Sequence, residues 1–272
     1  MSIFTGLSDR VAIVTGGADS IGAVVAKYLH SAGVKTMIAD INAAKGEELA
    51  SQLGEGAKFL PTDLASQEQI QRVVDQTVDE FKGIDFIINA ACIYADNGLE
   101  SSQEEWMSSF QVNVVGGALL VSKALTYLKE SSGASIINFG SISSGVAQAG
   151  RWTYPATKAA IEQLTKSQAL DLAPFNIRVN TIRPGITWSA PVAGLTGGNR
   201  AIADQVVSGY QPLGRVTEAD EVAECVLFLC SDSSSFVTGT ELAVDGGYGC
   251  LGPEAKESAM TAMIEAISKA TR

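Results

Sequence analysis

The segment Val11–Leu29, VAIVTGGADSIGAVVAKYL, joins an apolar run to a glycine-rich turn and then to a helical pattern. Val11–Thr15 is the first predicted strand, and the helical pattern follows Gly22. Glycines at such a turn let the backbone approach a pyrophosphate closely, and the first helical turn supplies free N–H groups and a positive dipole end. Strand, turn and helix in this order predict a dinucleotide-binding unit in preference to an ordinary glycine-rich turn.

Six further apolar runs follow the first, and helical patterns separate them. Strands this apolar, without alternating polar residues, are typical of a sheet that helices cover on both faces. The predicted fold class is α/β, a doubly wound Rossmann fold with a seven-stranded parallel sheet in a single domain. The six runs are Val34–Ala39, Lys58–Pro61, Ile84–Asn89, Ser135–Phe139, Arg178–Arg183 and Glu241–Val244.

Length and composition favour one domain with a short appendage. The chain has 272 residues, of which 46% are hydrophobic and 18% charged, which is enough apolar surface for a large core. We predict a Rossmann-fold domain over residues 1–252 and a C-terminal helical extension over residues 253–272. Residues 186–211 lack clear periodicity and predict a substrate-binding loop or lid within the domain.

Charge and cysteine content exclude several classes of partner. The net charge of −11 disfavours nucleic acid and anionic membrane as partners. The four cysteines show no metal-ligand spacing, so we predict no metal site and expect small buried side chains. The start of the chain lacks a basic segment followed by a long apolar one, which favours a cytoplasmic location. A single histidine, His30, argues against a Ser-His-Asp triad.

Asp40 ends the second predicted strand, eighteen residues after Gly22. A carboxylate in this place can accept hydrogen bonds from the adenosine ribose and repels a 2′-phosphate. Asp19, within the glycine turn, adds a second negative charge. Both acids favour NAD over NADP as the cofactor.

Tyr154 and Lys158 are four residues apart near the start of the helical stretch Thr153–Leu172, so they share one helical face. A neighbouring ammonium favours the phenolate form that proton abstraction needs. The spacing alone also fits a surface aromatic beside a lysine stem. Ser141, thirteen residues before Tyr154, and Asn113, in an apolar helical segment, support the catalytic interpretation, although each also fits a structural role.

With these residues in order, the chain from about Leu7 to Gly249 resembles the classical short-chain dehydrogenase/reductase family. The resemblance implies that Tyr154 is the catalytic acid/base, that Lys158 assists it and holds the nicotinamide ribose, and that Ser141 positions the substrate oxygen. It implies that Asn113 holds a water in the proton path. The cofactor-binding residues that it implies are Gly16, Ser20, Ile21, Gly22, Asp40, Ile41, Asp63, Leu64, Asn89, Ala90, Tyr154, Lys158, Pro184, Gly185, Thr187 and Ser189.

The chain departs from the family pattern at two places. Ser20 stands where the family usually has glycine, and we expect it to cap the following helix without preventing cofactor binding. Asn89-Ala90-Ala91-Cys92 replaces the usual Asn-Asn-Ala-Gly, which could alter the packing of the wall on the nicotinamide side.

The predicted function is an NAD-dependent oxidoreductase that transfers a hydride between nicotinamide and a secondary alcohol or ketone, in the dehydrogenase direction. The alternatives are an NADPH-linked carbonyl reductase and, from another class, a non-catalytic dinucleotide-binding or interaction protein. Tyr94, Trp152 and Trp188 join Ser141 as predicted substrate contacts, which favours an uncharged apolar or aromatic substrate. The same aromatic side chains would equally suit packing of the lid or a contact between subunits.

A homo-oligomer, specifically a homotetramer, is expected mainly from the resemblance. Family members commonly pair through the helices that match Asn113–Lys129 and Thr153–Leu172. Met260, Met263, Ile264 and Ile267 recur at helical spacing and add an apolar surface that needs burial.

Overall fold

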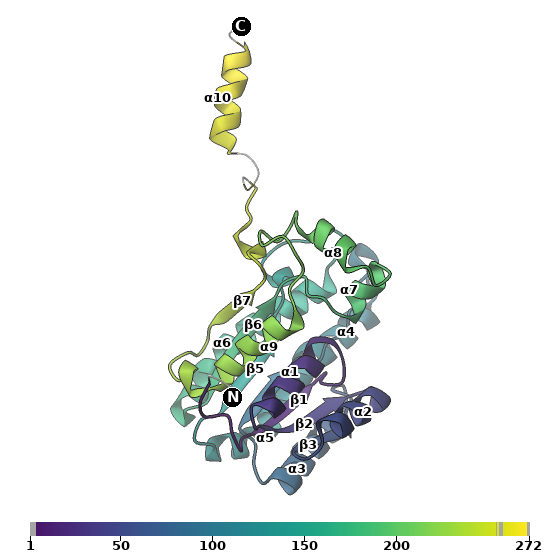
Figure 1. Ribbon diagram of the computed structural model, residues 1–272, viewed down its shortest axis with the longest axis vertical. Helices are drawn as coiled ribbons and strands as arrows, with labels where there is room; N and C mark the ends of the chain where they lie inside the picture. The colour runs from purple at the N-terminus through teal and green to yellow at the C-terminus, as the bar shows by residue number, and fades with distance from the viewer. Residues whose placement is uncertain (1–3, 254, 256–257, 271–272) are drawn as a thin grey trace.

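The computed structural model describes residues 4–253, 255 and 258–270, so residues 1–3, 254, 256–257 and 271–272 of the two predicted segments lie outside it. One seven-stranded sheet organises the chain (Figure 1), with the strand order β3-β2-β1-β4-β5-β6-β7 and every neighbouring pair parallel. The predicted fold class is confirmed. All seven strands begin and end within two residues of the predicted runs.

The parallel register brings the carboxyl ends of the central strands to one edge of the sheet. Thr15 pairs with Asn89, Asn89 with Asn138, and Asn138 with Thr181. Loops that leave these ends therefore converge, as in other open α/β sheets. The strands are β1 (Val11–Thr15), β2 (Lys35–Asp40), β3 (Ala57–Pro61), β4 (Phe86–Asn89), β5 (Ser135–Phe139), β6 (Arg178–Pro184) and β7 (Glu241–Val244).

Two hydrophobic cores hold helices against the two faces of the sheet. One core packs α1 (Ser20–Ser31), α2 (Ala43–Leu53) and α9 (Ala219–Cys230) through side chains such as Leu29 and Val226. The other packs α3 (Gln67–Phe81), α5 (Gly117–Glu130) and α6 (Thr153–Leu172) through side chains such as Val73 and Leu120. Burying one side chain of this size stabilises the folded state by about 1.5–3 kcal/mol relative to leaving it exposed.

Shorter elements surround the carboxyl edge of the sheet. The predicted lid contains α7 (Ala190–Leu195) and α8 (Arg200–Val207). Between α4 (Gln103–Phe110) and α5, the segment Gln111–Gly116, which includes Asn113, forms a π-helical turn, η2. The cysteine prediction is correct only for Cys230, because Cys92 and Cys225 are half-buried and Cys250 is exposed.

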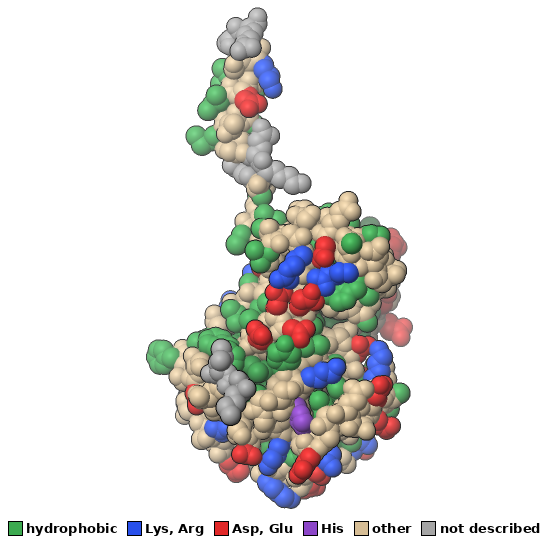
Figure 2. Space-filling model, viewed as in Figure 1, with side chains coloured by type: hydrophobic (Ala, Val, Ile, Leu, Met, Phe, Trp, Pro, Cys, Tyr) green, Lys and Arg blue, Asp and Glu red, His purple; other side chains and the backbone are tan. Residues whose placement is uncertain are grey.

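The C-terminal helix α10 (Ala259–Ala270) stands apart from the sheet and its covering helices in Figure 1. Its apolar side chains Met260, Met263 and Ile264 are exposed, and green side chains gather along one side of it in Figure 2. Among the described residues, no helix combines the length and apolar character needed to span a membrane.

Candidate active site

The glycine turn between β1 and α1 is shaped by close backbone contacts. Gly16 has a φ of +64°, and a Cβ on it would lie 2.7 Å from the Cα of Ala91. A Cβ on Gly22 would lie 2.1 Å from the carbonyl oxygen of Gly16. Neither position can hold a side chain without moving backbone. The turn therefore presents bare backbone N–H groups beside the start of α1, which suits a pyrophosphate.

Asp19, not Ser20, caps helix α1. The Asp19 Oδ1 accepts a hydrogen bond from the Ser20 backbone N–H at 2.6 Å, so the expected capping by the Ser20 hydroxyl is wrong. Ser20 is the first helical residue and has a φ of +50°. This left-handed conformation costs an L-residue about 1–2 kcal/mol and would cost glycine little.

Asp40 lies at the end of β2 and borders the active-site cavity. Its Oδ2 accepts from the Ala18 N–H at 3.1 Å, and its Oδ1 from the Asn42 N–H at 2.9 Å. Asp19 forms an ion pair with Lys45, with 2.5 Å between Oδ2 and Nζ. The hydrogen bond from Lys45 lowers the pKa of Asp19 and raises that of Lys45. Of the two acids that line the cavity, Asp19 is thus paired with Lys45, whereas Asp40 forms no ion pair with any described residue.

A cavity of about 530 Å³ connects this turn with the predicted catalytic residues. It is also bordered by apolar side chains of the lid and its neighbours, including Ile142, Ile186, Val192 and Leu195. The predicted cofactor residues that line it are Gly16, Ser20, Ile21, Gly22, Asp40, Ala90, Tyr154, Lys158, Pro184, Gly185, Thr187 and Ser189. The predicted residues absent from its lining, all of them described, are Ile41, Asp63, Leu64 and Asn89.

Helix α6 brings Tyr154 and Lys158 to the cavity on successive turns. Lys158 is 2% exposed, its Nζ lies 5.5 Å from the centroid of the Tyr154 ring, and it donates to the Phe139 carbonyl at 2.8 Å. Ser141 follows β5, and its Oγ accepts from the Ser143 N–H at 3.1 Å. A phenol, an ammonium and a hydroxyl thus share one cavity wall, which suits proton transfer to or from a bound oxygen.

Asn113 does not line the cavity but connects two of the segments that do. Its Oδ1 accepts from the Ile93 N–H at 2.8 Å, and its Nδ2 donates to the Ile93 carbonyl at 3.0 Å. The same Nδ2 donates to the Thr157 Oγ1 at 3.2 Å, and Thr157 donates to the Tyr154 carbonyl at 2.8 Å. The buried amide therefore joins the loop after β4 to helix α6.

Asp96 is a site residue that the sequence analysis missed. Its carboxylate accepts from the backbone N–H of Trp152 at 2.8 Å, of Tyr154 at 3.0 Å and of Gly98 at 3.1 Å. Helix α6 has no capping side chain of its own at Trp152. Asp96 supplies that cap from the loop after β4, and so fixes the first turn of the helix that carries Tyr154.

The three predicted aromatic contacts occupy different environments. Tyr94 lines the cavity and stacks on Tyr154 with 4.7 Å between ring centroids. Desolvation, with smaller contributions from Cys92 and Tyr154, raises the pKa of the Tyr94 phenol. Trp152 is 50% exposed, and neither it nor Trp188 is among the described residues that line the cavity. Trp188 instead packs on the lid cluster formed around Ala203.

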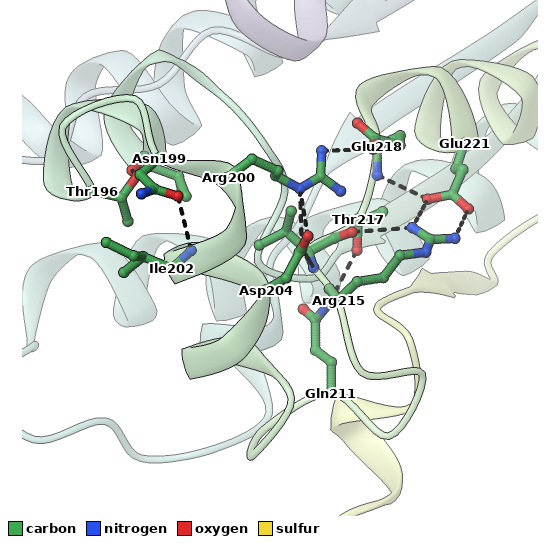
Figure 3. A network of polar contacts seen from close by, with 12 residues as sticks. Thr196, Asn199, Arg200, Ile202, Asp204, Gln211, Arg215, Thr217, Glu218 and Glu221 are labelled. Carbon is green, nitrogen blue, oxygen red and sulfur yellow. Dashed lines mark hydrogen bonds and ion pairs between the residues drawn. The ribbon is translucent and has the colours of Figure 1, made fainter.

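Ion pairs hold the lid helix α8 to the start of α9, as Figure 3 shows. Arg200 pairs with Asp204 at 3.0 Å and with Glu218 at 2.7 Å, while its guanidinium lies 5.4 Å from the Trp188 ring. Below this group, the side chain of Gln211 accepts from the Ile186 N–H at 2.5 Å. Gln211 thus fastens the end of the lid to its beginning at Ile186, and Arg200 fastens the lid to the start of α9.

The chain is similar to known proteins over most of its length. The model of a family described as enoyl-(acyl carrier protein) reductase matches residues 16–249. The chain is 34% identical over 251 residues to trans-4-hydroxycyclohexanecarboxylate dehydrogenase of Sinomonas cyclohexanicum, covering 89% of this chain and 93% of that protein. It is 33% identical over 246 residues to cyclopentanol dehydrogenase of Comamonas sp. (strain NCIMB 9872), covering 89% and 98%.

A solved structure of 3-ketoacyl-(acyl-carrier-protein) reductase from Brucella melitensis, complexed with NADH, superposes with a TM-score of 0.82 at 29% identity. The match covers 90% of this chain and all of that one. A second structure, titled as a short chain dehydrogenase/reductase family protein, superposes with a TM-score of 0.81 at 31% identity over 90% of this chain and 99% of its own. Fold, site and relatives together show that the chain belongs to the short-chain dehydrogenase/reductase family.

Proposed function

We propose that this oxidoreductase is an NAD-dependent dehydrogenase of secondary alcohols built on an apolar ring. The observation that carries the proposal is the single cavity shared by the glycine turn, Asp40 and the Ser141, Tyr154 and Lys158 side chains. The apolar lining around Ile142, Val192 and Leu195 supports a hydrocarbon body for the substrate. Support from Trp152 and Trp188 is withdrawn, since neither borders the cavity. Two relatives named above act, by their names, on ring alcohols.

The residues present fit a dinucleotide. Gly16 and Gly22 leave the space that a Cβ would fill, and the adjoining start of α1 can face a pyrophosphate. Asp40 at the end of β2 can accept from ribose hydroxyls and would repel a 2′-phosphate. Lys158 can reach the nicotinamide ribose, and Thr187, beside Pro184 and Gly185, the carboxamide.

The chain's own residues then handle the proton. NAD, when bound, supplies the hydride acceptor. Tyr154, as a phenolate, takes the proton of the substrate hydroxyl while the carbinol carbon gives up a hydride, which leaves a ketone. The buried ammonium of Lys158 stabilises the phenolate, and the Ser141 hydroxyl donates to the substrate oxygen. Asn113 and Asp96 keep Tyr154 in place through the backbone of α6.

The test is turnover of cyclic secondary alcohols, followed by NADH absorbance, in wild type and Tyr154→Phe. Tyr154→Phe removes the proton acceptor and changes little volume, so it should abolish turnover and leave NAD affinity nearly unchanged. Retention of a tenth of the wild-type kcat, equivalent to about 1.4 kcal/mol of barrier, would show that Tyr154 is not the acid/base.

Cofactor choice is tested separately through Asp40. We expect wild type to prefer NAD over NADP, and Asp40→Ala to narrow that preference mainly by weakening NAD. The ratio of kcat/KM values for the two cofactors measures this. Equal use of both by wild type would favour the NADPH-linked reductase instead.

We also propose that the enzyme is a homotetramer. The exposed face of α10 that includes Met260, Met263 and Ile264 supports this, because an apolar surface of this kind is stabilised by burial against another protein surface. Light scattering at micromolar concentration tests the assembly. A stable 28.4 kDa monomer would refute the proposal.

A further inference from the structure

Arg151 borders the active-site cavity just before helix α6, three residues ahead of Tyr154. Its backbone N–H donates to the Gln148 carbonyl at 3.2 Å, which fixes the loop that carries it. Among the described arginines, Arg151 alone has a guanidinium with no hydrogen bond or ion pair to the rest of the chain. The others pair with carboxylates, carbonyls or hydroxyls, as Arg200 and Arg215 do in Figure 3.

The acids that line the cavity lie elsewhere. Asp19 and Asp40 come from the β1–α1 turn and the end of β2, whereas Arg151 belongs to the segment after β5. Two strands separate β2 from β5 in the sheet, which corresponds to about 14 Å between the two strands. Arg151 therefore lies on the Tyr154 side of the cavity, where no carboxylate lines the described surface.

We propose, resting on the function above, that Arg151 binds a carboxylate of the substrate, and that the substrate class is ring hydroxy acids. A guanidinium matches a carboxylate through two parallel hydrogen bonds. Three residues of chain span at most about 11 Å, so Arg151 and Tyr154 lie within reach of the two ends of one small molecule. The net charge of −11 repels anions in general, and a guanidinium at the cavity would offset that repulsion for a carboxylate bound beside it.

This inference replaces the expectation of an uncharged substrate. The apolar wall at Ile142 and Val192 takes the ring, Ser141 and Tyr154 take the hydroxyl, and Arg151 takes the acid group. Because the acid group orients the ring, its contact with Arg151 affects substrate binding and determines which carbon faces Tyr154.

The experiment compares three alcohols: trans-4-hydroxycyclohexanecarboxylate, its methyl ester and cyclohexanol. The variants are Arg151→Gln and, as a matched control, Lys166→Gln, which removes an exposed positive charge from α6 outside the cavity lining. Wild type should prefer the acid over the ester. Arg151→Gln should lose about ten- to a hundred-fold in kcat/KM for the acid, mostly through KM, and change little for the ester. Lys166→Gln should match wild type on all three.

Calorimetric binding of cyclohexanecarboxylate, which has no hydroxyl to oxidise, separates the two proposals. Binding by the wild-type enzyme with NAD, weakened about tenfold or more in Arg151→Gln, supports the carboxylate site whatever the turnover. Intact binding with no oxidation of any alcohol would overturn the proposed function alone. Absent binding, or equal losses on acid and ester in Arg151→Gln, would overturn the role of Arg151.

Discussion

The glycine turn around Gly16 and Gly22 borders the cavity directly, whereas the lid borders it through α7 and is held in place through α8. Different forces fix these two regions. In the turn, backbone atoms pack so closely that a Cβ on Gly22 would lie 2.1 Å from a carbonyl oxygen. In the lid, part-exposed ion pairs from Arg200 to Asp204 and Glu218 fasten α8 to the start of α9. Steric contacts do not respond to salt, whereas ion pairs near solvent are screened. The cofactor side should therefore be rigid and the lid adjustable.

Gly22→Ala should give the largest effect. The added methyl group would collide with the Gly16 backbone, which must shift and carry with it the N–H groups proposed to bind the pyrophosphate. We expect NADH affinity to fall more than about a hundred-fold, the equivalent of about 2.8 kcal/mol, in a fluorescence titration. Gly83→Ala is the control, since nothing lies within 4 Å of its Cβ. Equal affinities in wild type and Gly22→Ala would show that the turn is not rigid.

Asp96→Asn should have an intermediate effect, because it weakens the cap on α6 without entering the cavity. Asparagine keeps one acceptor oxygen but loses the charge and the second acceptor, which should cost about 1 kcal/mol of stability, and a displaced Tyr154 should lower kcat several-fold. Asp171→Asn, an exposed carboxylate on the same helix, is the control. A kcat unchanged by Asp96→Asn would remove Asp96 from the positioning of Tyr154.

The contribution of Asp96 should also depend on pH. Desolvation acts to raise the pKa of Asp96, but the N–H groups of Trp152, Gly98 and Tyr154 outweigh it and hold the pKa below its usual value. A lowered folded-state pKa stabilises above the unfolded value of about 3.9, and that stabilisation disappears as pH falls through the folded pKa. The Tm difference between wild type and Asp96→Asn should be constant from about pH 6 to 8 and shrink below about pH 4.

Arg200→Gln should have the smallest effect on activity of these variants, because the lid can adjust to the loss of its ion pairs. It removes both ion pairs and the contact with the Trp188 ring. We expect KM for the alcohol to rise about two- to threefold with kcat nearly unchanged, and added salt to produce a similar rise in wild type. If the KM of wild type does not change with salt and Arg200→Gln loses much of its activity, Arg200 has a direct role at the site.

Local sequence signals were sufficient for the sheet and for one wall of the site. Apolar runs such as Ile84–Asn89 read as buried strands because a sheet covered on both faces excludes polar residues. Tyr154 and Lys158 read as neighbours because helical spacing fixes which side chains share a face. The tight turn after β1 was predictable because the close backbone contacts at Gly16 and Gly22 exclude side chains.

The remaining site depends on contacts between segments distant in sequence. Asp96 and Trp152 are 56 residues apart, and no local pattern links them. The absence of a capping residue before Thr153 was the available signal. The Ser20 hydroxyl was expected to cap α1. Ser20 is instead the first residue of the helix, and Asp19, which precedes it, caps the N-terminus. Trp188 lies on a loop, where spacing does not fix the direction of a side chain, and it packs against the lid.

The π-helical turn Gln111–Gly116 interrupts the regular α-helix and thereby places the side-chain amide of Asn113. A π turn holds one more residue than an α turn, which changes the phase of the flanking helices by about 100°. Deleting one residue here, such as Val115, would restore a continuous α-helix from α4 into α5. The same deletion would turn Asn113 away from Ile93, whose backbone it now holds. A shorter chain would thus make a better helix and a poorer enzyme, so a single-residue insertion can be retained here for its effect on geometry alone.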